Sequence, residues 1–234
     1  MHYFVRICCC LLLLLSLPAQ AAPSRLEAQY DIFKSGLKIA TMHETFTRDK
    51  GQYRIESITK PFGLFALLKH ETIRVISAGT VTAQGLRPQT FDYTREHDTD
   101  RNAHADFDWQ AGKVTLTDRA GTRSLPLHKD TQDRLSTMYQ FMFLKLDHSV
   151  ELKFDMTNGS KVDDYRYLIT PGRHVTVPLG SFRTLYLASP ARASGGRTEI
   201  WLAGKLDNLP CKMVITEGNG DKLTQTLTQL KLVP

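Results

Sequence analysis

Alternation of apolar and polar residues over most of the chain is the feature that most limits how this sequence can fold. The stretch LEAQYDIF (26–33) alternates up to a turn at 34–36, LKIATMHETFTR (37–48) up to a turn at 49–51, and QYRIESIT (52–59) follows. A period of two places every second side chain on one face of a strand, and short glycine-containing turns join strands as hairpins. These residues predict three antiparallel strands.

The same pattern continues to the C-terminus. Further strands are expected at 71–82, 89–97, 102–109, 113–118, 150–157, 163–170, 174–177, 182–189, 198–204, 211–218 and 222–233. Alternation over so many segments is typical of an antiparallel sheet with one face toward a core.

One segment, 130–148, has a different period. Its apolar residues recur at steps of three and four: Leu135, Met138, Tyr139, Met142, Phe143 and Leu146. Asp130 is a suitable N-cap, and Asp133 adds negative charge to the first turn. We expect one amphipathic helix of about four turns near residues 131–146.

The first 21 residues have the layout of a cleaved secretory signal. They contain Arg6, an apolar core from Ile7 to Leu17 and a small-x-small end at 19–21. The apolar core is shorter than the roughly 20 residues that a membrane-spanning helix needs, and no later segment approaches that length. We therefore expect the mature chain to be periplasmic in a Gram-negative bacterium, with no transmembrane segment after signal cleavage.

The length that remains, about 210 residues, suits one β-rich domain from 22 to 234, without a proline-rich linker or repeat. A sheet of about a dozen strands must curl or close, and its concave face can cover the apolar stripe of a helix. The predicted fold class is mainly β, a curved antiparallel sheet or half-open β-barrel with one amphipathic helix.

Cysteine usage limits the chemistry of the mature chain. Cys8, Cys9 and Cys10 leave with the signal, so that Cys211 remains. One cysteine makes neither an internal disulfide nor a tetrahedral zinc site. We expect Cys211 to be a small buried apolar residue.

The formal net charge is +6, but the basic residues are spread along the chain and mixed with acids, as in 47–54 and 128–134. A nucleic-acid binder would carry its basic residues on one face. The sequence therefore argues against nucleic-acid binding and leaves at most a mild attraction to anionic lipid.

An apolar run, KPFGLFALLKH (60–70), interrupts the alternation. It contains Phe62, Leu64, Phe65, Leu67 and Leu68. Buried, these side chains would stabilise by several kcal/mol at about 25 cal/mol per Å²; exposed, they would form a patch of the kind that proteins use for binding. We expect a lid at the open end of the sheet, where an acyl chain, a lipid or a partner's hydrophobic segment enters.

Several short motifs occur in a characteristic order. They are Gly36 in an early strand, Asp133-x-Leu135-Ser136, Gly180-x-Phe182-x-Thr184, and Trp201-Leu202 followed by Leu209-Pro210. With these motifs the chain resembles, over nearly its whole mature length, the exported bacterial family catalogued as domain of unknown function 3108. The resemblance implies a β-rich periplasmic protein and supplies no activity. Asp133 and Ser136 are expected to form hydrogen bonds at a helix start around a packed Leu135.

Catalytic residues are not indicated. Ser136, His128 and His148 provide the residue types of a nucleophilic triad, but Ser136 lacks a Gly-x-Ser-x-Gly elbow and a glycine-rich oxyanion loop. We expect a protein that is not an enzyme and has no cofactor.

A metal site is not indicated either. His97, Asp98, Asp100 and His104 are close in sequence and of suitable types, but their spacing matches no known motif. Two strands joined by a polar turn explain them equally well.

The leading hypothesis is a protein of the cell envelope that binds a lipid or another hydrophobic or amphiphilic ligand, or serves envelope maintenance. The candidate ligand contacts are Phe62, Leu64, Phe65, Leu67, Leu68, Met138, Met142 and Trp201. The first alternative is a protein-interaction module that meets an envelope protein through strand edges or the 62–68 run. The second is a hydrolase.

Overall fold

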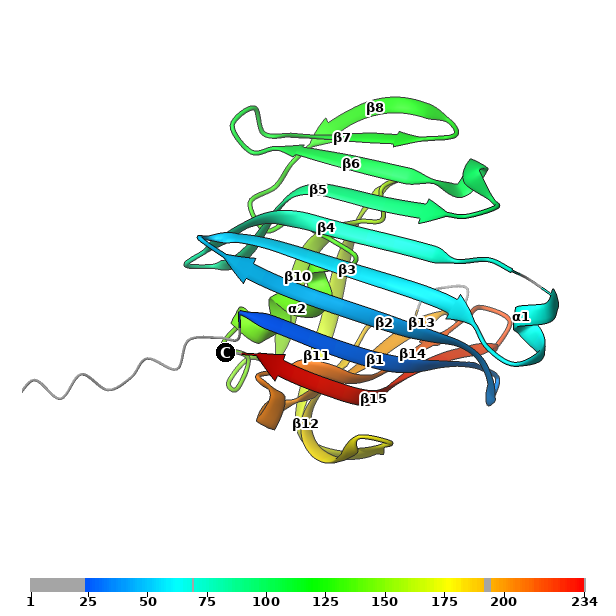
Figure 1. Cartoon of the computed structure of the whole chain (residues 1–234). Coiled ribbons are helices and arrows are strands. Elements are labelled where there is room, and N and C mark those ends of the chain that lie inside the picture. The colour runs from blue at the N-terminus through cyan, green and yellow to red at the C-terminus, as the bar shows by residue number, and fades with distance from the viewer. Residues whose placement is uncertain (1–23, 69, 192–194, 234) are drawn as a thin grey trace, which may run out of the picture.

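The computed structural model describes residues 24–233 except 69 and 192–194, and the side chain of Leu68 is also outside the description. The expected signal segment, 1–21, lies outside the described residues. The described chain forms one curved sheet with a short helical segment against its concave face (Figure 1).

The sheet is made of fifteen strands in the part of the chain that is described. They are β1 (Arg25–Lys34), β2 (Leu37–Asp49), β3 (Gln52–Pro61), β4 (Ile73–Thr82), β5 (Gly85–Arg95), β6 (Ala103–Asp108), β7 (Lys113–Asp118), β8 (Gly121–Pro126), β9 (Gln132–Asp133), β10 (Glu151–Thr157), β11 (Val162–Val177), β12 (Gly180–Ala188), β13 (Arg197–Ala203), β14 (Leu209–Thr216) and β15 (Lys222–Val233). The helical elements are α1 (Leu64–Leu68), α2 (Ser136–Gln140), η1 (Thr99–Arg101), η2 (Phe141–Phe143) and η3 (Gly204–Leu206).

The strand order follows the chain from β8 back to β1 and then from β15 back to β9, because β1 and β15 pair in the middle of the sheet. All neighbours are antiparallel except β9 and β10, which are parallel. The expectation of a mainly β, curved antiparallel sheet is confirmed.

The expected strand count of about a dozen was too low. Two expected strands, 163–170 and 174–177, are one long strand, β11. Two strands were missed: β8, whose side chains are largely exposed, and β9, which has only two residues and lies within the expected helix.

The first two hairpins follow directly from the local sequence. The β1–β2 turn has Ser35 and Gly36 at φ 46° and 89°, and the β2–β3 turn has Lys50 and Gly51 at φ 46° and 77°. Two-residue turns with positive φ match the twist of the strands that they join.

The core lies against the concave face. Alternate residues of β1, namely Leu26, Ala28 and Tyr30, are buried there, as the period of two predicted. One apolar cluster joins α2 to β1–β3, β5–β7, β14 and β15, and a second packs beneath β11 to β13 with η2. Cys211 is buried in the first cluster, as expected.

The expected helix near residues 131–146 is present but is much shorter than four turns. Gln132 and Asp133 pair as a strand with Met156 and Thr157, the helix proper begins at Ser136, and after η2 the backbone becomes extended at Leu144. Pairing with β10 gives the backbone groups of Gln132 and Asp133 their hydrogen-bond partners. This tertiary contact therefore outweighs the local preference for a helix at these residues. None of the described helices is long and apolar enough to span a bilayer.

The two ends of the sheet approach each other. At the β10–β11 turn, a Cβ on Gly159 would lie 2.8 Å from the Cβ of Ala103 in β6. Arg123 of β8 donates hydrogen bonds to Asp118 and to the carbonyl of Ser160. These contacts bring β6 and β8 against the β10–β11 turn and leave the space beside them only partly enclosed.

Candidate functional site

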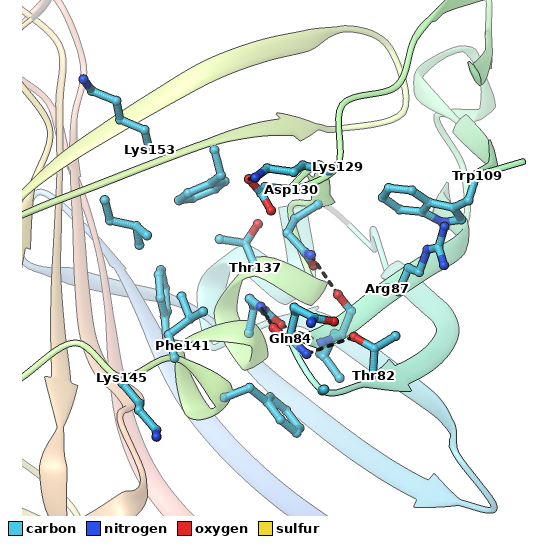
Figure 2. Close-up of a pocket in the computed structure, with 18 of the residues that line it drawn as sticks. Thr82, Gln84, Arg87, Trp109, Lys129, Asp130, Thr137, Phe141, Lys145 and Lys153 are labelled. Carbon is cyan, nitrogen blue, oxygen red and sulfur yellow. Dashed lines mark hydrogen bonds and ion pairs between the residues drawn. The ribbon is translucent and has the colours of Figure 1, made fainter. Parts of the chain in front are cut away.

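A pocket of about 1010 Å³ opens where the β4–β5 turn, α2 with η2, and β10 come together (Figure 2). Its lining comes from segments far apart in sequence, which the approach of the two sheet ends brings together. The lining residues are Thr82, Ala83, Gln84, Leu86, Arg87, Trp109, Leu127, Lys129, Asp130, Gln132, Thr137, Gln140, Phe141, Phe143, Leu144, Lys145, Leu152, Lys153 and Phe154.

One part of the lining is apolar. Phe141 is buried, whereas Phe143, Leu144, Leu152 and Phe154 are only partly buried and present apolar surface to the pocket. The Phe154 ring also stacks on the rings of Tyr165 and Tyr167, at 6.1 Å between centroids in each pair. This stacking fixes Phe154 as a rigid part of the pocket wall.

Charged side chains surround this apolar surface. Arg87, Lys129, Lys145 and Lys153 line the pocket together with one acid, Asp130. In Figure 2, Lys145 and Lys153 lie on one side of the pocket and Arg87, beside Trp109, lies on the other. The pocket thus combines an apolar wall with a cationic rim.

Two glutamines hold the β4–β5 turn against α2. Gln140 accepts a hydrogen bond from the N–H of Leu86 at 2.7 Å and donates to the carbonyl of Gln84 at 2.8 Å. Gln132 donates to the carbonyl of Leu86 at 2.9 Å, while its buried Oε1 has no partner among the described residues. A Cβ on Gly85, which has φ 105°, would collide with the Gln140 carboxamide, so a glycine is needed for this close approach.

Beneath the pocket, Glu44 of β2 anchors α2. The Tyr139 hydroxyl donates to Glu44 Oε2 at 3.0 Å, and the Tyr139 ring stacks on Phe46 at 5.4 Å. Burial raises the pKa of Glu44 to about 7, although the hydrogen bonds from Tyr139 and Ser57 act in the opposite direction. The same burial, together with the Glu44 charge, raises the pKa of Tyr139 well above its ordinary value.

A second buried carboxyl, Asp133, organises the start of α2. Its Oδ1 accepts from the N–H groups of Leu135 and Ser136 at 2.8 and 2.7 Å, and its Oδ2 accepts from the Ser77 hydroxyl at 2.5 Å. Burial raises the pKa of Asp133 to about 6, against the lowering effect of these hydrogen bonds. The expected helix-start bonding around a packed Leu135 is thus observed.

Ser136 is part of this helix start. Its hydroxyl accepts from the N–H of Asp133 at 3.0 Å and donates to the carbonyl of Asp133 at 3.1 Å, and the residue is fully buried. His128 is instead exposed and bonded to Asp155, and His148 is exposed. The three residues considered for a triad are not brought together.

The 62–68 run forms the short helix α1 at the β3–β4 connection and does not line the pocket. The side chains of Phe62, Leu64 and Leu67 are 47%, 68% and 72% exposed, and Phe65 is partly buried. Lys38 lies over the Phe62 ring, with its ammonium 4.0 Å from the ring centroid. The lid expected at the open end is therefore an exposed helix elsewhere on the surface, and the side chain of Leu68 is outside the description.

The other candidate ligand contacts also lie apart from the pocket lining. Met138 and Met142 pack, partly buried, against the core. Trp201 lies beside Tyr186, at 5.0 Å between centroids, with the Lys212 ammonium 5.0 Å from its ring. Their role in ligand binding stays a prediction.

Two of the four residues considered for a metal site, His104 and Asp98, pair with other side chains. His104 contacts Asp92 at 2.7 Å and Asp106 at 2.9 Å, and Asp98 pairs with Arg95 and Arg101. Over residues 24–233, apart from the gaps, no group of three or more metal-ligating side chains is found.

The pocket lining was missed because no single segment indicates it. The only local signal is a cation within an apolar run, as in Leu144-Lys145-Leu146 and Leu152-Lys153-Phe154. Such triplets also occur in ordinary half-buried strands. They indicate a pocket lining only when it is known that the two ends of the sheet meet.

Comparison with known proteins gives a family and a fold. The family model described as "Protein of unknown function (DUF3108)" matches residues 28–228. Among solved structures, the "Beta-barrel-like Protein of Domain of Unknown Function DUF1849 from Brucella abortus" is similar, with a TM-score of 0.58 and 13% identity, over 90% of this chain and 98% of that chain. At this identity the likeness shows a shared β-barrel-like fold. None of the curated proteins matches the chain.

Proposed function

The chain belongs to the DUF3108 family of proteins of unknown function, and from this premise we propose that it is an exported, non-enzymatic protein that binds an amphiphile in the pocket between the β4–β5 turn, α2 and β10. The apolar chain of the ligand lies against Phe141, Leu152 and Phe154. Its polar end lies at the rim.

The observation that carries this proposal is the combination of size and lining. The pocket has a volume of about 1010 Å³, and ligand sites typically have about 300–1,000 Å³ with a mostly apolar wall and a few polar groups. Partly buried aromatic and leucine side chains supply the wall, and glutamine and lysine side chains supply the polar groups.

Export and the absence of catalysis are parts of the same proposal. The signal-like segment 1–21 supports a periplasmic location. The closed hydrogen bonding of Ser136 with Asp133 supports binding rather than hydrolysis, because the hydroxyl is fully buried, bonded to the backbone of Asp133 and not part of the pocket lining.

The test is to purify the full-length exported protein, extract it with organic solvent and identify co-purified amphiphiles by mass spectrometry. Replacing Leu144 and Leu152 together with serine removes about 1–1.5 kcal/mol of apolar contact each, so the retained amphiphile should fall tenfold or more. Leu168→Ser is the matched control, because Leu168 lies on β11 outside the pocket and is 48% exposed.

If neither the extract nor direct titration with a fluorescent fatty-acid analogue shows binding by the parent protein, the proposal is wrong. Equal loss in the Leu168 variant would also contradict it, because the effect would then not belong to the pocket.

A second candidate function, contact with an envelope protein, is favoured by one observation. Leu64 and Leu67 of α1 are mostly exposed beside the exposed Phe62, and together they form an apolar patch away from the pocket. Apolar side chains gathered at one place on a surface are typical of interaction sites.

A further inference from the structure

We propose that the pocket selects amphiphiles whose head group is an anion, a carboxylate or a phosphate. This inference rests on the proposed function and adds the chemical class of the ligand. The cations on one side of the rim hold the head, and the apolar wall of η2 and β10 holds the chain.

The charge balance of the lining points to an anion. Four cationic residues and one acid line the pocket, whereas the whole chain has 30 basic and 24 acidic residues. Basic residues are thus in a four-to-one excess here against a nearly even mixture elsewhere.

Two of the four cations have no carboxylate partner within the described residues. Lys145 forms no ion pair there, and neither does Arg87, whose guanidinium lies 4.6 Å from the centroid of the Trp109 ring. Stacking on Trp109 holds the guanidinium in place and leaves its N–H edges free to donate. A carboxylate or phosphate is the group that such a planar donor fits best.

The other two cations are only partly neutralised. Lys129 is 4.0 Å from Asp130, and both side chains are largely exposed. Lys153 contacts Glu151 at 2.9 Å, but Glu151 also pairs with Arg166, so one carboxylate serves two cations. The rim therefore keeps a net positive charge after its internal pairs are counted.

A small free anion does not account for the site. The wall formed by Phe141, Phe143, Leu144, Leu152 and Phe154 offers no hydrogen-bond donor from its side chains, and it extends beyond the volume of a phosphate ion. An ion bound at the rim alone would leave this apolar surface in water. A chain attached to the anion covers it.

The experiment compares chain-matched probes by isothermal titration of the full-length exported protein after delipidation. The probes are myristate, myristyl alcohol and inorganic phosphate. We expect myristate to bind about tenfold more tightly than the alcohol, as for one or two charge-assisted hydrogen bonds, and phosphate alone to bind far more weakly.

The variants Arg87→Gln and Lys145→Gln are made separately, because the two unpaired cations lie on opposite sides of the pocket and one head group contacts only one of them. The variant on the side that holds the head should reduce the preference for myristate over the alcohol to about twofold or less. Lys205→Gln is the matched control, since Lys205 is exposed on η3, outside the pocket. This control should keep the preference, and circular dichroism should show that all variants fold.

The outcomes separate the two proposals. Equal binding of myristate and the alcohol would overturn the anionic head group and keep the amphiphile site. No binding of either would overturn both. Phosphate binding as tightly as myristate would also overturn both, since the apolar wall would then contribute nothing.

Discussion

Two buried carboxyl groups join the helical segment to the sheet. Glu44 holds α2 through Tyr139, and Asp133 caps its first turn and bonds to Ser77. Neither group has a cationic partner among its described contacts, so each is stable in the interior mainly as the protonated acid or through several hydrogen bonds. The position of α2, and with it one wall of the pocket, depends on these two residues.

Their raised pKa values predict that stability depends on pH. The pKa of Glu44 is about 7 in the folded chain against an ordinary value of 4.5, so between these pH values the folded state binds more protons than the unfolded state. The free energy of unfolding must therefore fall as the pH rises through this window. Asp133 adds to the fall between 3.8 and about 6.

Glu44→Gln tests this dependence, because glutamine keeps an acceptor for Tyr139 and does not ionise. The difference in free energy of unfolding between the variant and the parent should grow in the variant's favour by on the order of 2–3 kcal/mol from pH 4.5 to pH 8. Urea denaturation at several pH values measures it. Glu217→Gln, which removes an exposed carboxyl, should leave the pH profile unchanged. A Glu44 variant with the parent's profile would show that this carboxyl does not titrate as inferred.

At the scale of elements, α1 is attached to the sheet rather than built into its core. Replacing Leu64 and Leu67 with serine should change the free energy of unfolding by less than about 0.5 kcal/mol each, because the two side chains are 68% and 72% exposed. Leu116→Ser, at a fully buried position of β7, should cost several kcal/mol in the same denaturation experiment.

The α1 variants also test the second candidate function. If α1 contacts an envelope protein, a photo-crosslinker at Phe65 should capture that protein reproducibly when Leu64 and Leu67 are present. It should no longer capture it when Leu64 and Leu67 are replaced with serine. A large loss of stability would instead mean that α1 is part of the core.

Elements with a consistent local signal were predicted from sequence, and elements that depend on distant partners were not. The strands β1 to β3 follow from alternation and from turns such as Lys50-Gly51. The segment 131–146 has a clear helical period, yet its first residues form β9 because β10 offers them backbone partners. The exposure of α1 could not be predicted either, because an apolar run does not by itself indicate whether it is buried or exposed.

At the scale of the whole molecule, the pocket exists because a long open sheet curls until its ends meet. Sequence patterns predicted the curl, since so many strands cannot stay flat. They could not give the position at which the β10–β11 turn meets β5 and β6, and that position decides which side chains face one another. The candidate residues Met138, Met142 and Trp201 were chosen for their apolar character alone, whereas the pocket lining was selected by topology.

The meeting of the sheet ends can be measured with two glycines of nearly equal backbone conformation. Gly159 has φ 87° and a prospective Cβ 2.8 Å from Ala103, whereas Gly220 has φ 86° and nothing within 4 Å. Both Ala substitutions carry the cost of a positive φ, about 1 kcal/mol, and only Gly159→Ala adds a clash between the β10–β11 turn and β6. We expect Gly159→Ala to lower the free energy of unfolding by at least 1–2 kcal/mol more than Gly220→Ala.

A second substitution separates this contact from a general loss of packing. Ala103→Gly removes the atom that the new methyl group meets first, so in the double variant part of the extra cost of Gly159→Ala should be recovered, although the Phe91 ring at 3.2 Å limits the recovery. The two sheet ends would then be coupled through these positions. Equal effects of Gly159→Ala and Gly220→Ala, with no recovery in the double variant, would mean that the ends do not touch in solution. The pocket between them would then lack one of its supports.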